Sequence, residues 1–303
     1  MLKKAFLVGI NAYPDHPLRG CVNDVKAMKE LLKNLYGFKE DDIRLITDKE
    51  ATSKGIVAGL GWLAQGGDAQ AVRVFHYAGH GHFAPDKSGD EPDGSDEALV
   101  PYDHKTTGYL IDDKLKELYD RFPANGNLTL IMDCCNSGSN NRGPGEGQEQ
   151  IFYRFIPLTP TERKAIAAAK RAFHDEQRKF VMKEVKGFAK VRGRDRDFEQ
   201  RIAAAMQKFE KQRFGEVRVR EGNVLLAACQ SDQQAADARI GGAYRGAFTF
   251  YLVKFLRESN GKISYYSLME KVGKMLYDHK FNQKPQLECI DGREKAQALA
   301  LFK

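Results

Sequence analysis

Two short segments of the chain combine reactive side chains with glycine. HYAGHGH at residues 76–82 closes one apolar run, and DCCNSG at residues 133–138 directly follows another. A cysteine thiol needs a nearby base to become a thiolate, and an imidazole with a near-neutral pKa suits that task. The two segments therefore predict a cysteine nucleophile paired with a histidine base.

The glycines in these segments indicate how an oxyanion could be stabilised. Without a side chain, glycine lets backbone N–H groups approach a carbonyl oxygen on which negative charge develops. We expect the backbone N–H groups of Gly81 and Cys135 to do this.

The same residue types leave other interpretations open. A histidine at a strand end is often structural, and buried cysteines are mostly inert core residues. Together with Cys134 and Cys135, His76, His80 and His82 are also zinc-ligand types. However, the segments contain no Cys-x-x-Cys pair, and His76 lies in the apolar run whereas the other two lie in a glycine turn. This spacing argues against zinc.

The elements that must position these side chains alternate along the chain. Predicted strands cover residues 5–10, 42–47, 72–77, 98–101, 128–132 and 223–228, separated by stretches with helical periodicity. This alternation predicts an α/β fold with a mainly parallel sheet and helices on both faces. Reactive groups in such folds gather beyond the carboxyl ends of the strands, where both segments are expected.

Composition places the chain among ordinary globular proteins. Its 303 residues are 42% hydrophobic and 29% charged, and no apolar run reaches the ~18 residues of a membrane span. The apolar residues 5–10 are too short for a signal peptide, so we expect a cytoplasmic protein. The five cysteines are then expected to be reduced thiols.

Positive charge is concentrated in one region. Residues 151–220 hold 19 Lys/Arg and 9 Asp/Glu, whereas the rest of the chain is slightly acidic. The region is rich in Ala, Lys, Arg, Glu and Gln, which favours helices. We interpret it as a basic helical insertion into one α/β domain. A solvated helical decoration and a nucleic-acid-binding face remain alternatives, although aromatic side chains there are sparse.

The two reactive segments resemble the His and Cys blocks of metacaspases, the caspase-like peptidases of bacteria, fungi, plants and protists. Further blocks agree in order: LRGCVNDV at 18–25, GDEPDGSDE at 89–97, VPYD at 100–103, LLAACQSDQQAAD at 225–237, GAFT at 246–249 and QKPQ at 283–286. The resemblance implies a caspase-like three-layer sandwich around a six-stranded sheet. It also implies a large-subunit-like region (1–150) and a small-subunit-like region (221–303) on either side of the insertion (151–220).

Site roles follow from the resemblance. It aligns Cys135 with the nucleophile, His80 with its base and Cys134 with a neighbour that is often serine. The implied S1 pocket, which holds the side chain before the cut bond, is formed by Cys21, Asp24, Ala78 and Asp133. Two carboxylates in one pocket select a cation, so Arg or Lys is expected at P1. Alternatively, Asp24 could be a helix N-cap and Asp133 could cap a loop.

The sequence departs from the family pattern at several positions. Asn136 stands where histidine is frequent, and Ala78 stands where serine is common. Some metacaspases need calcium, and the positions of its ligands match Asp96, Asp112 and Asp113, whose carboxylates suit that ion. The further acidic ligand expected after the nucleophile is not evident, because residues 140–142 read NNR. Calcium control therefore stays open, and the chemistry itself needs no cofactor.

The position of the insertion predicts how the peptidase is activated. Caspase-like chains are often cut between their two regions, and the least helical stretch here is VRGRDR at 191–196. We expect a zymogen that is activated by cleavage, often its own, after Arg192, Arg194 or Arg196. Its partners would be protein or peptide substrates with Arg or Lys at P1 and an activating protease or regulator, with no membrane. The alternatives are a latent caspase-fold regulatory module or a nucleic-acid-binding protein.

Overall fold

The computed structural model describes residues 2–67, 71–89, 91–123, 127–135, 151–185, 196–214, 223–230 and 233–289. The chain forms two compact units. The first comprises Met1–His82, Glu97–Pro157 and Val219–Lys303, and the second comprises Phe83–Asp96 and Leu158–Arg218. Residues 151–157, at the start of the predicted insertion, thus belong to the first unit.

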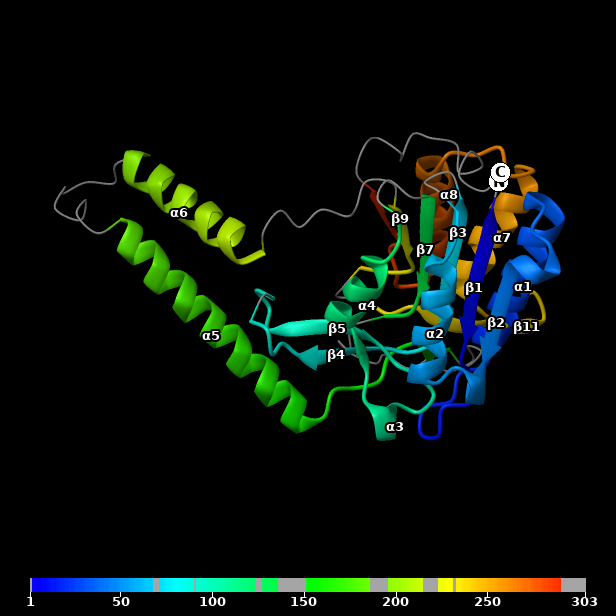
Figure 1. Ribbon diagram of the computed structural model, residues 1–303, viewed down its shortest axis with the longest axis horizontal. Coiled ribbons are helices and arrows are strands. Elements are labelled where there is room, and N and C mark those ends of the chain that lie inside the picture. The colour runs from blue at the N-terminus through cyan, green and yellow to red at the C-terminus, as the bar shows by residue number, and fades with distance from the viewer. Residues whose placement is uncertain are drawn as a thin grey trace. The chain divides into compact units, whose positions relative to one another are not determined.

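A six-stranded sheet forms the centre of the first unit, in the order β12–β9–β7–β3–β1–β2 (Figure 1). The strands are β1 (Lys3–Gly9), β2 (Ile43–Thr47), β3 (Val72–Ala78), β7 (Asn127–Asp133), β9 (Asn223–Ala227) and β12 (Gln286–Cys289). Neighbouring strands are parallel except β12, which is antiparallel to β9. The predicted mainly parallel six-stranded sheet is therefore confirmed.

Helices cover both faces of this sheet (Figure 1). On one face α7 packs against both α1 and α8, and on the other α2 packs against α4. Their bounds are α1 (Cys21–Tyr36), α2 (Ser53–Ala64), α4 (Asp112–Tyr119), α7 (Ala247–Glu258) and α8 (Tyr265–Asp278). Shorter helices are η1 (Glu40–Asp42), η2 (Asp48–Glu50) and α3 (His104–Thr107). This arrangement is the predicted three-layer sandwich.

Strands β3 and β7 position the two reactive segments. All seven residues of β3 are buried, as expected for a central parallel strand covered on both faces. The parallel register pairs Ala78 with Asp133, the last residues of the two strands. His80 and Cys135 each follow that pair by two residues, so both lie at the carboxyl edge of the sheet.

Two small sheets lie outside the six-stranded one, and of their strands the sequence predicted only one, at residues 98–101, which overlaps β5. One has the order β11–β10–β8, made of β8 (Phe152–Tyr153), β10 (Ala236–Ile240) and β11 (Ala243–Gly246). The other has the order β4–β5–β6, made of β4 (Gly81–Pro85), β5 (Ser95–Leu99) and β6 (Leu110–Ile111). These strands have two to five residues, too few to show an alternating pattern in the sequence.

The second unit contains α5 (Pro160–Glu184) and α6 (Arg196–Phe214), which pack together. Thr159 and Glu162 form a capping box, and Pro160 occupies the first turn of α5, where its missing N–H costs nothing. The Phe209 ring lies 5.6 Å from that of Phe173 and 5.4 Å from that of Phe180. These aromatic side chains therefore hold the two helices together, and the predicted helical insertion is confirmed. None of the described helices is long and apolar enough to cross a membrane.

Two glycines of α2 provide a test of how this helix packs on the sheet. A Cβ on Gly59 would lie 2.1 Å from the Phe6 ring of β1, which itself stacks on Phe75. We expect Gly59→Ala to lower the free energy of unfolding by about 1–3 kcal/mol through overpacking. Gly61→Ala is the matched control, because its Cβ would contact nothing. It should stabilise the helix by about 0.5–1 kcal/mol. Urea unfolding measures the free energy of unfolding of both variants. Equal changes would contradict the close contact between Gly59 and the Phe6 ring.

Candidate active site

The ring of His80 is held in one orientation at the edge of the sheet. Its Nε2 lies 2.6 Å from the backbone oxygen of His16. A carbonyl can only accept, so Nε2 must carry the proton and Nδ1 must carry the lone pair. Nδ1 is buried and has no hydrogen-bond partner among the described residues. The fold therefore leaves His80 with one nitrogen free to act as a base.

Cys135 follows β7 and is 1% exposed. Its Sγ accepts the N–H of Ala235, which leads into β10. Burial raises the pKa of the Cys135 thiol well above its usual value. Burial likewise lowers the pKa of His80 to about 3. In this form the site therefore holds a neutral thiol and a neutral imidazole, and it is shielded from water.

A carbonyl oxygen from the chain itself occupies the predicted oxyanion hole. The backbone oxygen of Arg154 accepts the N–H of Gly81 at 3.0 Å and the N–H of Cys135 at 3.1 Å. These are the two donors expected from the glycine pattern. Two N–H groups that converge on one carbonyl oxygen are the arrangement that stabilises an oxyanion during acyl transfer.

The side chain of Arg154 lies between the two predicted pocket carboxylates. Its guanidinium contacts Asp24 Oδ2 at 2.5 Å and Asp133 Oδ2 at 3.0 Å. All three side chains are at most 1% exposed. Burial alone would lower the pKa of Arg154, but the surrounding anionic groups, led by Asp133, raise it well above its usual value. The arginine is therefore a buried cation held by two carboxylates.

Further hydrogen bonds orient the two carboxylates. Asp24 accepts the N–H of Gly246 at 2.9 Å. Asp133 accepts the N–H and the hydroxyl of Thr249, at 3.1 and 2.6 Å, and this hydroxyl lies 3.2 Å from Nε2 of His76. Burial raises the pKa of Asp24 to about 8, and Arg154 opposes the shift. The N-cap of α1 is Gly20, so the alternative role of Asp24 as a helix cap is wrong.

The backbone on both sides of Arg154 is hydrogen-bonded within the site, and the chain bends at Arg154 itself. Phe152 and Tyr153 pair antiparallel with Asp237 and Ala236 of β10. The N–H of Arg154 donates to the oxygen of Ala235 at 3.1 Å. Beyond it, the N–H of Ile156 donates to the oxygen of Gly81 at 3.2 Å. Main-chain pairing on both sides of one residue is how proteins bind an extended peptide by adding a strand to a sheet.

The remaining predicted pocket residues lie close to this strand. Ala78 is buried at the end of β3, paired in register with Asp133. Cys21 is fully buried in the first turn of α1, and burial raises its pKa well above the usual value, an effect that the Arg154 charge opposes. The neighbouring Cys134 contacts another cysteine, because its backbone oxygen accepts a hydrogen bond from the thiol of Cys229.

The residues that could bind a metal lie in different surroundings. In the described part of the chain, no three His, Cys, Asp or Glu side chains gather as metal ligands. His76, His80 and His82 each place a ring nitrogen on a different oxygen, those of Thr249, His16 and Ile156, as a zinc cluster would not. For calcium, Asp112 accepts the N–H of Asp113 at the start of α4, and Asp96 lies in β5.

Of the cleavage candidates, Arg192 and Arg194 lie outside the described residues, and Arg196 begins helix α6. Arg154, Gly246 and Thr249 are parts of the site that the sequence did not predict. One signal was available for Arg154, since it is the single basic residue within FYRF at 152–155. Gly246 and Thr249 lie in a quoted family block, but their backbone and hydroxyl roles have no side-chain signature.

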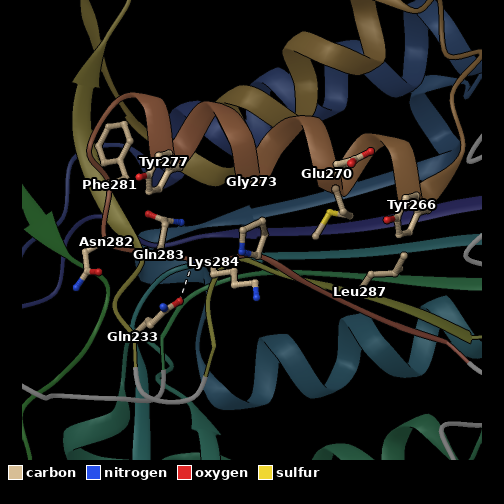
Figure 2. A pocket seen from close by; sticks show the side chains of 12 residues that line it. Gln233, Tyr266, Glu270, Gly273, Tyr277, Phe281, Asn282, Gln283, Lys284 and Leu287 are labelled. Atoms are coloured by element: carbon tan, nitrogen blue, oxygen red, sulfur yellow. Dashed lines mark hydrogen bonds between the residues drawn. The ribbon is translucent and has the colours of Figure 1, made fainter.

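A separate cavity of about 540 Å³ lies along α8 (Figure 2). It is lined mainly by apolar and amide side chains of α8 and of residues 281–287, including Tyr266, Met269 and Leu287. The adjoining Gln283 is buried and accepts the N–H of Ala236, while its amide donates to Ala228. None of the dyad or pocket residues lines this cavity. Its border contributes to the site only by fixing β10.

The buried ion triad predicts a large effect for one substitution. Arg154→Met keeps the side chain's length but leaves Asp24 and Asp133 buried without a cation. We expect the free energy of unfolding to fall by about 3–5 kcal/mol. The deficit should be larger at pH 9 than at pH 5. The pKa of Asp24 is already raised in the folded protein, and loss of the Arg154 cation should raise it further. At pH 9 the folded variant must ionise Asp24 against this raised pKa, whereas at pH 5 the group keeps its proton.

Lys274→Met is the control for this measurement. Lys274 is an exposed partner of Asp278, so its loss should change stability by at most about 1 kcal/mol. Urea unfolding at the two pH values measures both variants. If both variants lowered the free energy of unfolding equally at the two pH values, Arg154 would not be the cation that stabilises Asp24 and Asp133.

Comparisons with known proteins identify the family and the fold of the chain. A family model described as "Metacaspase, peptidase C14 domain" matches residues 3–141. A Metacaspase-1 of Meyerozyma guilliermondii is 30% identical over 300 residues, covering 94% of this chain and 68% of that protein. A Metacaspase-1 of Coccidioides immitis is 29% identical over 95% of this chain, and the chain spans 61% of its length.

Solved structures share the fold. A Geobacter sulfurreducens protein matches with a TM-score of 0.63 at 24% identity, covering 97% of both chains. Caspase-1 of Spodoptera frugiperda matches with a TM-score of 0.51 at 12% identity, covering 95% of this chain and 86% of that one. The caspase-like fold, the family model and the extended match to a curated relative agree. The chain belongs to the metacaspases, a family of cysteine peptidases.

Proposed function

We propose that the chain is an endopeptidase that cleaves proteins after Arg and Lys, with Cys135 as nucleophile and His80 as base. The observation that carries this proposal is the position of Arg154. Its side chain fills the acidic pocket while its carbonyl oxygen receives the N–H groups of Gly81 and Cys135. A P1 arginine of a substrate would need the same two sets of contacts at once.

The chemistry follows from the groups in place. Nδ1 of His80 takes the proton from Sγ of Cys135, and the thiolate attacks the carbonyl carbon of the P1 residue. The negative charge moves to the carbonyl oxygen, where the two N–H groups stabilise it. The protonated imidazole then donates to the leaving amine as the C–N bond breaks. Water, deprotonated by the same nitrogen, hydrolyses the resulting thioester.

The pocket should prefer Arg to Lys. The planar guanidinium can reach both carboxylates with different nitrogens, as Arg154 does with Asp24 and Asp133. An ammonium group is a compact point charge on a flexible stem, and it matches this fork less well. An acidic P1 residue would add a third negative charge to a buried pair of carboxylates, so it should be rejected.

Activation by cleavage remains part of the proposal, and the bond after Arg154 is the first candidate. Arg154 already lies in the site, whereas a cut after Arg196 would require the start of α6 to unwind. Until the strand leaves, it blocks access to the pocket. The occupied groove also supports the second candidate function, a latent regulatory module that becomes a peptidase only on release.

The substrate preference predicts a clear order among short fluorogenic peptides. Peptides ending in Arg should be cleaved faster than those ending in Lys, and those ending in Asp should not be cleaved. Cys135→Ala should abolish activity, whereas Cys134→Ser should retain it. Hydrolysis with added calcium and with a chelator measures calcium dependence in the same assay. No cleavage in any condition, including after limited proteolysis, would overturn the peptidase proposal.

Self-cleavage predicts defined new chain ends. Incubation should yield a fragment beginning at Phe155, detected by intact mass and amino-terminal sequencing. Cuts in the insertion would instead give fragments that begin at residue 193, 195 or 197. Arg154→Gln should remove the first product and leave any others. Cys135→Ala is the control and should stay intact. If the active protein remains a single uncut chain, activation by cleavage is wrong.

A further inference from the structure

We propose that the site has a second specificity pocket, S3, in which Arg19 and Tyr244 clamp an aromatic P3 side chain. The proposal rests on the proposed function, because it treats residues 152–155 as a peptide bound in the substrate groove. With Arg154 at P1, Tyr153 stands at P2 and Phe152 at P3. The bound strand therefore reports which side chains the groove accepts beyond the acidic pocket.

Strand pairing sets the positions of Phe152 and Tyr153. Successive side chains of a strand point to opposite faces, so these two lie on opposite faces of β8, and the chain bends at Arg154. The pairing of Phe152 with Asp237 and of Tyr153 with Ala236 fixes this register. An incoming substrate that pairs with β10 in the same register would place its P3 side chain where the Phe152 ring lies.

Two side chains hold that ring. The guanidinium carbon of Arg19 lies 4.9 Å from the centre of the Phe152 ring. The Tyr244 ring lies 5.9 Å from it at an interplanar angle of 64°, an edge-to-face contact. Arg19 also lies 5.0 Å from the centre of the Tyr244 ring. A cation over two aromatic faces and an edge-to-face ring pair both favour a π-system at P3 over an aliphatic chain.

The backbone around both clamp residues is anchored, so the subsite is preformed. The N–H groups of Arg19 and Gly20 both donate to Asp237 Oδ2, at 2.6 and 3.0 Å. The backbone oxygen of Tyr244 accepts from the side-chain amide of Asn23 at 2.8 Å. A Cβ on Gly20 would lie 2.6 Å from the Arg245 backbone, so this approach requires glycine. The loop with Arg19 and the strand with Tyr244 are thus held side by side.

The charge of Arg19 raises one competing possibility, an acidic P3 residue. In the structure the guanidinium faces two rings rather than a carboxylate, although Asp237 lies close by on β10. Asp237 instead accepts backbone N–H groups and already places negative charge near the subsite. We therefore assign the subsite to Phe, Tyr or Trp, and Glu at P3 becomes an arm of the test.

The test compares peptides that differ only at P3, with Arg at P1 and Tyr at P2. We expect kcat/KM to be roughly tenfold higher for Phe than for Ala at P3. Cyclohexylalanine, which has the size of Phe without the π-system, should fall clearly below Phe. The Phe-to-Ala ratio should approach one in Arg19→Ala and Tyr244→Ala, and it should be largely kept in Arg19→Lys and Tyr244→Phe. Equal rates for Phe and cyclohexylalanine, or faster cleavage with Glu, would overturn the clamp.

A second measurement does not depend on peptidase activity. In a His80→Ala background, iodoacetamide labelling of Cys135, identified by mass spectrometry, reports how often the strand leaves the site. Phe152→Ala should speed labelling several-fold more than Tyr153→Ala, because only Phe152 contacts the clamp. Equal acceleration would overturn the S3 assignment. Absence of peptide cleavage together with the expected labelling difference would overturn the proposed peptidase function and leave the clamp standing.

Discussion

The active-site region depends on one buried interaction, the guanidinium of Arg154 between the carboxylates of Asp24 and Asp133. The three charges come from the first turn of α1, the end of β7 and the segment after β8. Backbone N–H groups at the start of α7 and just before it complete the coordination. Two buried carboxylates are costly without a cation, so the pocket is stable only when a cation occupies it or water enters. The electrostatics that hold the fold together here are also those that would select a substrate.

The geometry of the candidate site comes mostly from the backbone. The register between β3 and β7 brings His80 and Cys135 to one edge, and the N–H groups of Gly81 and Cys135 converge on a single oxygen. A backbone carbonyl, that of His16, sets the tautomer of the histidine. No buried carboxylate is needed behind the ring. Since a carbonyl is uncharged, it orients the imidazole without stabilising its protonated form as strongly as a carboxylate would.

The two reactive groups are neutral because both are buried. Burial lowers the pKa of His80 and raises that of the Cys135 thiol, so the ion pair is costly to form in this arrangement. A cut after Arg154 would leave the whole basic insertion on the carboxyl-terminal fragment. A cut at residues 192–196 would divide the insertion between α5 and α6, so the two routes give different active species.

The sequence by itself determined the alternating α/β architecture, and it predicted the reactive pair, the two oxyanion donors and the acidic residues of the pocket. These features depend on local patterns, such as buried runs that end in glycine, and on ordered blocks that resemble a family. Only the tertiary structure decided that Arg154 fills the pocket and that Asp24 binds a cation instead of capping α1. It also decided that Arg19 and Tyr244, more than two hundred residues apart in the chain, share one ring. Such contacts depend on strand register and on close backbone approach between distant segments, which leave no periodic trace in the sequence.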